Sequence, residues 1–140
     1  DKAVTGNVSG GINLLGNMYN YNGPMLWTVY LFHDNSVTSD SIMALVDDAF
    51  NEIIENPIDQ KTLDRAKVKI RSEFYDEVDS FYGFGKADLL ASYALFEDNP
   101  NKINSIEDEF KKVTPELIQK TAKEFLRNSN RTVLTIIPNK

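Results

Sequence analysis

The 140-residue chain contains no cysteine and a single histidine, His33. Without cysteine it can form neither disulfides nor thiolate metal ligands. A zinc site needs three or four converging histidine, cysteine or carboxylate ligands, and one histidine can build neither His-Glu-x-x-His nor its inverse, His-x-x-Glu-His. No serine lies in a Gly-x-Ser-x-Gly turn, so a Ser-His-Asp triad is not indicated. The residues therefore predict no catalytic residue and no metal ligand in this chain.

Concentrated positive charge and long apolar runs are missing too. The 15 basic residues are scattered among 21 acidic ones, giving a net charge of −6, so we expect no nucleic-acid partner. No apolar run is long enough to span a bilayer. The chain opens on Asp1 without a signal peptide, and we expect it to be a piece of a longer protein whose targeting information lies upstream. An extracytoplasmic bacterial compartment is compatible with the lack of cysteine, although nothing requires it.

Two consecutive helices are the clearest feature of the chain, between Val37 and Tyr75. They are joined at Asn56-Pro57, and Thr38 and Asp59 are their expected N-caps. The first has a broad apolar stripe at the helical period, formed by Ile42, Leu45, Val46, Ala49, Phe50, Ile53 and Ile54. The second has a thinner one, formed by Leu63, Ala66, Ile70 and Phe74. Such stripes usually face a core, so this pair is expected to be scaffold.

Three strands and three further helices complete the pattern. Residues 3–14, 25–33 and 131–137 are expected strands, the last ending at Pro138. The second strand is apolar on both faces, which indicates a strand covered on both sides or facing another domain. The third helix is expected at 81–96, with an apolar stripe of Phe84, Ala87, Leu90, Ala91, Ala94 and Leu95. The fourth is expected near 103–112, and the fifth starts at Thr114-Pro115 with threonine as cap.

This order of elements predicts an α+β fold. The last strand should return to the first two, because a lone strand leaves its backbone groups unpaired. An antiparallel or mixed sheet with about five helices on one face follows. No linker divides residues 1–140, so we treat them as one segment. Three strands are few for five helices, which indicates an incomplete half of a larger domain with an open sheet edge, and we expect self-association through that edge.

Few residues look like contacts for a ligand. Carboxylate clusters such as Asp47/Asp48, Asp76/Glu77/Asp79 and Glu107/Asp108/Glu109 lie on expected exposed helix faces and are interpreted as solvated charge. Tyr19, Tyr21 and Tyr82 are expected to be exposed aromatics. Tyr19 and Tyr21 lie in the loop between the first two strands, and they are the candidate contacts for a substrate or partner.

Five motifs, taken in order, resemble the C-terminal half of a domain of the pitrilysin/insulinase-type zinc peptidases, the inverzincin group. They are a glycine-containing strand, a Gly-Pro-hydrophobic strand, a helix pair, a Val-Thr-Pro helix start and a closing strand ending in proline. Their sequences are TGNVSGGINL, GPMLWTVYL, IDQKTLDRAKVKI, VTPELIQKTAKEFL and NRTVLTIIP. The resemblance covers nearly the whole chain.

The resemblance implies a clamshell of repeated α+β domains. In that family one type of domain holds zinc through His-x-x-Glu-His and a downstream glutamate, while a later domain lacks the motif and helps to enclose the peptide. This chain has no such motif, so no zinc ligand or general base carries over to it. Some members place an arginine and a tyrosine at the entry to the first matched strand; that tyrosine would fall near Gly6 and is missing here.

Three hypotheses follow. The first is a non-catalytic, substrate-enclosing C-terminal domain of a zinc metallopeptidase, whose partners are a catalytic domain or subunit and the peptide, with zinc expected only in that catalytic part. The second is a structural or assembly module of the same fold, as in the family's inactive partner subunits. The third is an unrelated α+β ligand-binding domain, which would have a closed pocket and a sheet complete in itself.

Overall fold

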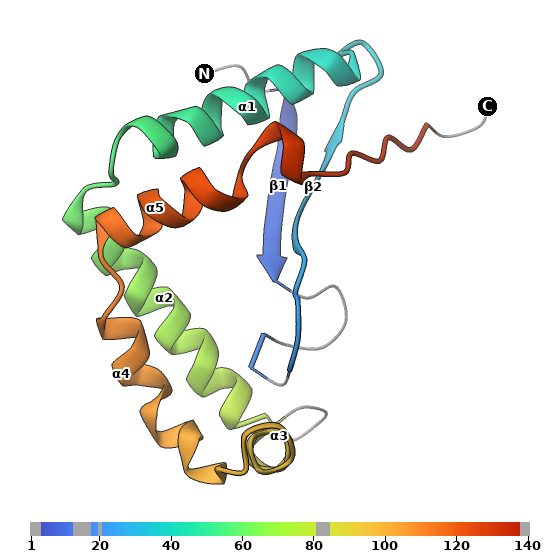
Figure 1. Cartoon of the computed structure of the whole chain (residues 1–140). Helices are drawn as coiled ribbons and strands as arrows, with labels where there is room; N and C mark the ends of the chain where they lie inside the picture. The colour runs from blue at the N-terminus through green and yellow to red at the C-terminus, as the bar shows by residue number, and fades with distance from the viewer. Residues whose placement is uncertain (1–3, 13–17, 20, 81–84, 138–140) are drawn as a thin grey trace. The chain divides into compact units, whose positions relative to one another are not determined.

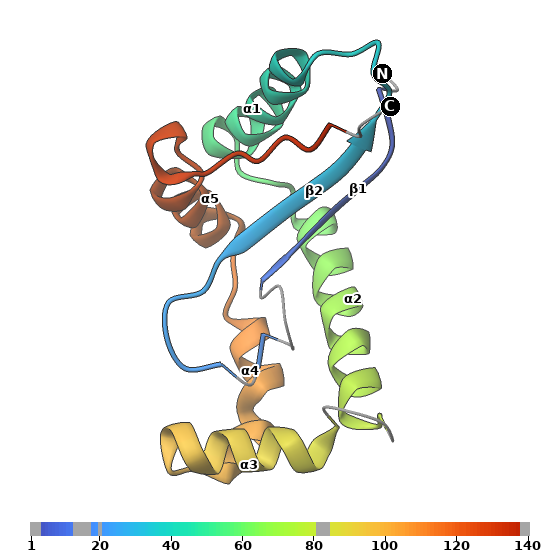
Figure 2. The ribbon, with the colours of Figure 1, turned by 90° about the vertical axis from the view of Figure 1, so that its right-hand side faces the viewer.

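A computed structural model describes residues 4–12, 18–19, 21–80 and 85–137. The described elements are, in chain order, β1 (Thr5–Ile12), β2 (Trp27–His33), α1 (Ser39–Glu55), α2 (Gln60–Val78), α3 (Lys86–Glu97), the 3-10 helix η1 (Pro100–Ser105), α4 (Ile106–Lys111), α5 (Pro115–Phe125) and the 3-10 helix η2 (Asn128–Asn130) (Figure 1). β1 and β2 pair as a two-stranded antiparallel sheet and lie side by side in Figure 2. The predicted α+β class is confirmed.

The elements group into two compact units. Unit 1 comprises the described parts of residues 1–6, 33–63 and 113–140. Its central contact is α1 packed beside α5, with Ile42, Leu63 and Ala122 buried. Gln119 on α5 donates hydrogen bonds to the carbonyl oxygens of Ile54 (2.9 Å) and Glu55 (3.1 Å). These carbonyls belong to the last turn of α1 and lack partners within the helix, so α5 caps its neighbour.

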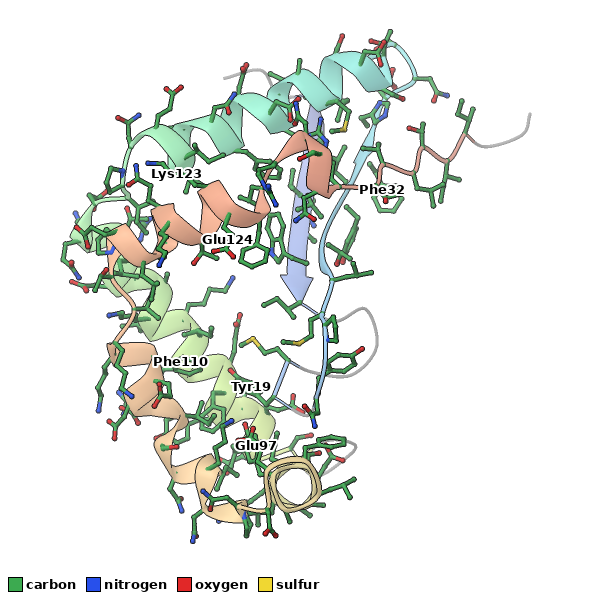
Figure 3. All side chains as sticks on the ribbon, in the orientation of Figure 1. Tyr19, Phe32, Glu97, Phe110, Lys123 and Glu124 are labelled. Carbon is green, nitrogen blue, oxygen red and sulfur yellow. The ribbon has the colours of Figure 1, made fainter. Side chains whose placement is uncertain are left out.

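Unit 2 comprises the described parts of residues 7–32 and 64–112 and holds the larger apolar core. Residues from α2, α3, η1 and α4 form it: Phe74, Leu89, Tyr93, Ile103 and Ile106. Leu89 is fully buried. Tyr19 and Phe110 pack against this cluster, and the Tyr19 ring meets Phe74 edge-on at 5.2 Å between centroids (Figure 3).

The expected helix starts are confirmed. The Thr38 side chain accepts a hydrogen bond from the Ser41 amide at 3.2 Å at the start of α1. Asp59 accepts one from the Thr62 amide at 2.8 Å as α2 begins. Thr114 accepts one from the Leu117 amide at 3.2 Å, with Pro115 as the first residue of α5. Each side chain satisfies an amide that the helix itself leaves unpaired.

The third helix differs from its prediction. Residues 81–84, including Phe84, lie outside the described residues, and α3 begins only at Lys86. A Cβ on Gly85 would lie 2.3 Å from the Ser80 carbonyl oxygen, so only glycine permits this approach. The buried positions of α3 are Leu89 and Tyr93, which the predicted stripe did not include. Of that stripe, Leu90 is half-buried against the core, whereas Leu95 is 78% exposed. Apolar residues lie on most sides of α3, so the helical spacing of these residues could not predict which side is buried.

The predicted third strand is not formed. Residues 131–137 have neither helical nor strand structure and make no backbone hydrogen bond to another described residue. A strand requires a neighbouring row of amides and carbonyls, and the described ladder joins β1 only to β2. The fourth predicted helix is a 3-10 turn, η1, followed by the shorter α4.

The Thr114 cap yields a stability prediction. Thr114→Ala removes the hydrogen bond to Leu117 and should lower the free energy of unfolding by about 1 kcal/mol. Thr121→Ala, on the exposed side of the same helix, is the matched control and should change it by less than about 0.5 kcal/mol. Urea unfolding followed by circular dichroism measures both variants. Equal effects would contradict the cap's contribution.

Candidate interaction surface

The residues best suited to chemistry do not converge. His33 ends β2, half-buried, with Nδ1 3.0 Å from the backbone oxygen of Asp34. Over the described ranges, no group of three or more histidine, aspartate or glutamate side chains could hold a metal ion. The described part of the chain therefore offers no candidate metal centre.

Several of the clustered carboxylates pair with basic side chains. Asp47 accepts hydrogen bonds from both terminal nitrogens of Arg131, one of them at 3.2 Å. This contact holds the pKa of Asp47 below its ordinary value. Asp108 lies 2.8 Å from Lys111, whose hydrogen bond and charge likewise lower its pKa. Such contacts keep a carboxylate ionised, which suits an ion pair and not a general acid.

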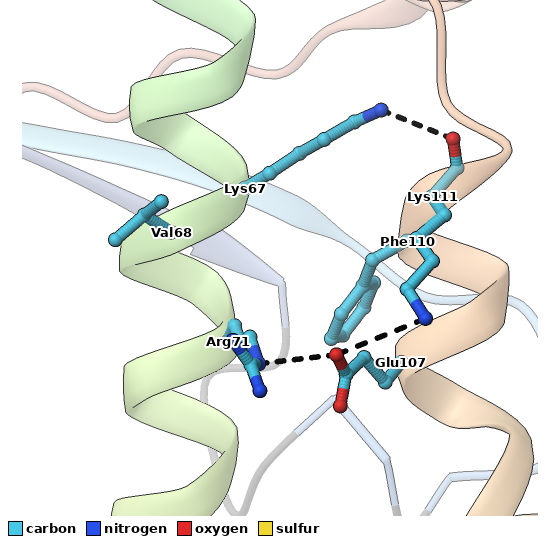
Figure 4. A pocket seen from close by; sticks show the side chains of 6 residues that line it. All are labelled: Lys67, Val68, Arg71, Glu107, Phe110 and Lys111. Carbon is cyan, nitrogen blue, oxygen red and sulfur yellow. Dashed lines mark hydrogen bonds and ion pairs between the residues drawn. The ribbon is translucent and has the colours of Figure 1, made fainter.

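A shallow pocket of about 200 Å³ lies between α2 and α4 (Figure 4). Its lining combines basic, acidic and apolar side chains: Lys67, Val68, Arg71, Glu107, Phe110 and Lys111. In Figure 4, Lys67 reaches from α2 toward the backbone of Lys111, and Arg71 reaches toward Glu107. The pocket is open to solvent, unlike a ligand cavity enclosed by apolar walls.

The polar groups of this pocket already have partners. Lys67 Nζ donates to the carbonyl oxygen of Lys111, the last residue of α4, at 3.1 Å. At the other end of α4, Glu107 accepts from Arg71 at 3.1 Å and from the Tyr75 hydroxyl at 2.8 Å. Lys67, Arg71 and Tyr75 are spaced four residues apart on one side of α2. We call this set of contacts, with Glu107, the α2–α4 clasp and assign it a structural role.

The two candidate tyrosines have different environments. Tyr19 is half-buried against the core of unit 2, where burial, followed by the nearby groups of Tyr93, Glu73 and Glu77, raises its pKa to about 12. Tyr21 is 49% exposed. Of these two tyrosines, only Tyr21 has a ring exposed enough to contact a peptide or partner. That contact remains a prediction. Tyr82 lies outside the described residues.

The sheet carries several exposed apolar side chains among the described residues of unit 2. A Cβ at Gly10 would lie 3.6 Å from Val29 and 3.7 Å from Trp27, so these residues share one face. The alternation of strands adds three further apolar residues to that face. We call this set the apolar sheet face; it consists of Val8, Ile12, Trp27, Val29 and Leu31. Four of the five are exposed, Leu31 being half-buried.

Apolar residues are exposed on the opposite face of β2 as well. Tyr30 is 59% exposed and Phe32 83% exposed (Figure 3). Thr28, which precedes both on the same face, donates a hydrogen bond to the Gly11 carbonyl oxygen at 3.3 Å. Two large aromatic side chains on this face are therefore open to solvent. Within the described residues neither face of β2 is covered, so the first of the two expectations for this strand is not met. The other, that one face meets another domain, stays a prediction.

A third exposed apolar stretch follows Arg131 in unit 1. Val133, Leu134, Ile136 and Ile137 are 52%, 82%, 81% and 77% exposed. The sequence pattern identified these residues as apolar and strand-prone, but it could not reveal that no other described segment pairs with their backbone.

The comparisons give no guide to function. Set against protein-family models, curated proteins and solved structures, the chain shows no match. The resemblance to pitrilysin-type peptidases therefore rests on the sequence motifs alone. Among the described helices, none is long and apolar enough to cross a membrane.

The α2–α4 clasp can be tested by mutation. Glu107→Ala removes an acceptor shared by Arg71 and Tyr75 and should lower the free energy of unfolding by about 1–2 kcal/mol. Glu109→Ala, which removes only the local pair with Lys112, should change it by less than about 0.5 kcal/mol. Chemical denaturation measures both, and a larger loss for Glu109→Ala would refute the clasp.

The environment of Tyr19 predicts an alkaline effect on stability. In the unfolded chain its hydroxyl ionises near pH 10, whereas the folded protein retains the proton to about pH 12. The unfolded state therefore holds fewer protons between these values, and stability should fall as the pH rises through this window. Tyr19→Phe should reduce that fall, and Tyr21→Phe serves as the control. Denaturant unfolding at pH 10 and 12 measures it; identical pH dependence in wild type and Tyr19→Phe would contradict the assignment.

Proposed function

We propose that this chain is a non-catalytic, substrate-enclosing C-terminal domain segment of a pitrilysin/insulinase-type zinc peptidase. The observation that carries the proposal is the order of the five motifs along nearly the whole sequence. Two of them mark the starts of α2 and α5, where Asp59 and Thr114 cap the helices. In this reading, the zinc, its ligands and the general base belong to another domain or subunit.

The exposed apolar surfaces support an enclosing role. A wall of a peptide chamber must pack against neighbouring domains or contact peptide side chains. The apolar sheet face, with Trp27 at 48% exposure, and the exposed Tyr21 are suited to such contacts. The chemistry that a peptidase needs would then lie outside these residues, since one histidine and no cysteine give too few zinc ligands.

The alternative is a structural or assembly module with the same fold. The missing tyrosine near Gly6 supports it, because some family members have a tyrosine at the entry to the first matched strand, and substrate contact by that route does not carry over to this chain. The same apolar sheet face would then be buried permanently against a partner subunit and would not contact peptide.

The proposal predicts that the purified chain holds no stoichiometric zinc and cleaves no peptide. Metal analysis after dialysis against zinc, together with hydrolysis of a quenched fluorescent peptide library, measures both properties. Chelator-sensitive proteolysis by this chain would overturn the proposal. Zinc-dependent cleavage that appears only when a domain carrying His-x-x-Glu-His is added would support it.

Fluorescence of the single tryptophan, Trp27, can distinguish the substrate-enclosing domain from the assembly module. Trp27 lies on the apolar sheet face, so peptide bound there changes its fluorescence. Titration with unstructured peptides should shift the Trp27 emission if the chain helps to enclose substrate. Tyr21→Ala should weaken the response if Tyr21 takes part. No response to any peptide, with stable binding to a partner subunit, would favour the assembly module.

A further inference from the structure

The segment Thr132–Ile137 has the composition of a strand but pairs with no strand that the structure describes. Its six residues, Thr-Val-Leu-Thr-Ile-Ile, carry no charge and contain neither glycine nor proline. β-branched residues of this kind favour extended backbone. Within the described part of the chain its amides and carbonyls have no backbone partner. Its large side chains are 52–82% exposed.

The features that normally protect an exposed edge are absent here. Natural edge strands carry lysine or proline, bulges or inward-pointing charges, which prevent pairing with another chain. Thr132–Ile137 contains neither of these residue types and no charge, and the nearest proline, Pro138, follows it directly. An uncharged strand-prone stretch of six residues is the type that readily pairs with a copy of itself.

The start of the segment is held in place. Arg131 is half-buried and binds Asp47 of α1 through two hydrogen bonds. Just before it, the Asn130 side chain donates to the Phe125 carbonyl oxygen at 3.0 Å and closes the turn after α5. Because these contacts already fix one end, pairing would order fewer residues than it would in a free tail.

We propose that two copies of the chain associate by pairing Thr132–Ile137 as antiparallel strands about a two-fold axis. In the symmetric register, Val133 lies opposite Ile136 of the partner copy and Leu134 lies opposite Thr135. One segment supplies both sides of the contact, as a two-fold interface requires. The inference does not depend on the peptidase family.

Among the surfaces through which two copies could meet, charge disfavours this segment least. Each chain has a net charge of −6, so most contacts between copies bring like charges together. Opposed like charges destabilise paired strands. The segment is neutral, and its flanking Arg131 is compensated by Asp47. Added salt should therefore strengthen the dimer by screening repulsion between the remaining surfaces.

The test is sedimentation equilibrium of the full chain over a range of protein concentrations. Wild type should show a monomer–dimer equilibrium. Ile136→Lys places one lysine on each paired strand and should weaken the dimer about tenfold or more. Leu26→Lys, a substitution at a residue that is also highly exposed (76%) but belongs to the other unit, should leave the dimer intact. Circular dichroism verifies that each variant is folded.

A spin label provides a second, independent measurement. The chain has no native cysteine, so Thr135→Cys accepts a single label. Dipolar broadening should occur with Thr135→Cys and disappear when Ile136→Lys is added, while a label on Leu26→Cys should show none. A strict monomer at every concentration would overturn the proposal. A dimer that survives Ile136→Lys but dissociates with Leu26→Lys would also overturn it, and would place the contact near the sheet.

Discussion

Burial of Leu89 among Phe74, Tyr93, Ile103 and Ile106 is the contact on which unit 2 depends. This cluster joins α2, α3, η1 and α4, none of which could bury an apolar stripe alone. Truncating a fully buried leucine typically costs about 2–5 kcal/mol, a large part of a small domain's stability. The α2–α4 clasp lies beside this cluster. It holds α4 along α2, because Lys67 binds the last residue of α4 and Arg71 and Tyr75 bind Glu107 near its start.

Local rules predicted the parts of the fold that depend on neighbouring residues. The caps at Thr38, Asp59 and Thr114 form as expected because each bond joins residues three positions apart. The failures came where distant residues decide the outcome. In α3 the predicted stripe counted three alanines as apolar, whereas the buried residues are Leu89 and Tyr93. Residues 131–137 have the composition of a strand, but no described segment pairs with them.

The candidate surfaces were only partly predictable for the same reason. Alternation in β2 placed Trp27, Val29 and Leu31 on one face, but their exposure depends on what the rest of the chain leaves uncovered. Glu107 was interpreted as solvated charge, whereas it is the shared acceptor of Arg71 and Tyr75, both more than 30 positions away in the chain. Tyr19 was expected at the surface and instead contributes to the core.

The interleaving of the two units has a consequence for synthesis. Every residue of unit 2 precedes Val113, so its core can close while the rest of the chain is still being made. Unit 1 must wait, because α1 finds its partner α5 only after roughly sixty further residues have emerged. Until then the apolar side of α1 is without cover. Within unit 1, α1 is therefore the first helix to be made but is among the last elements to be packed.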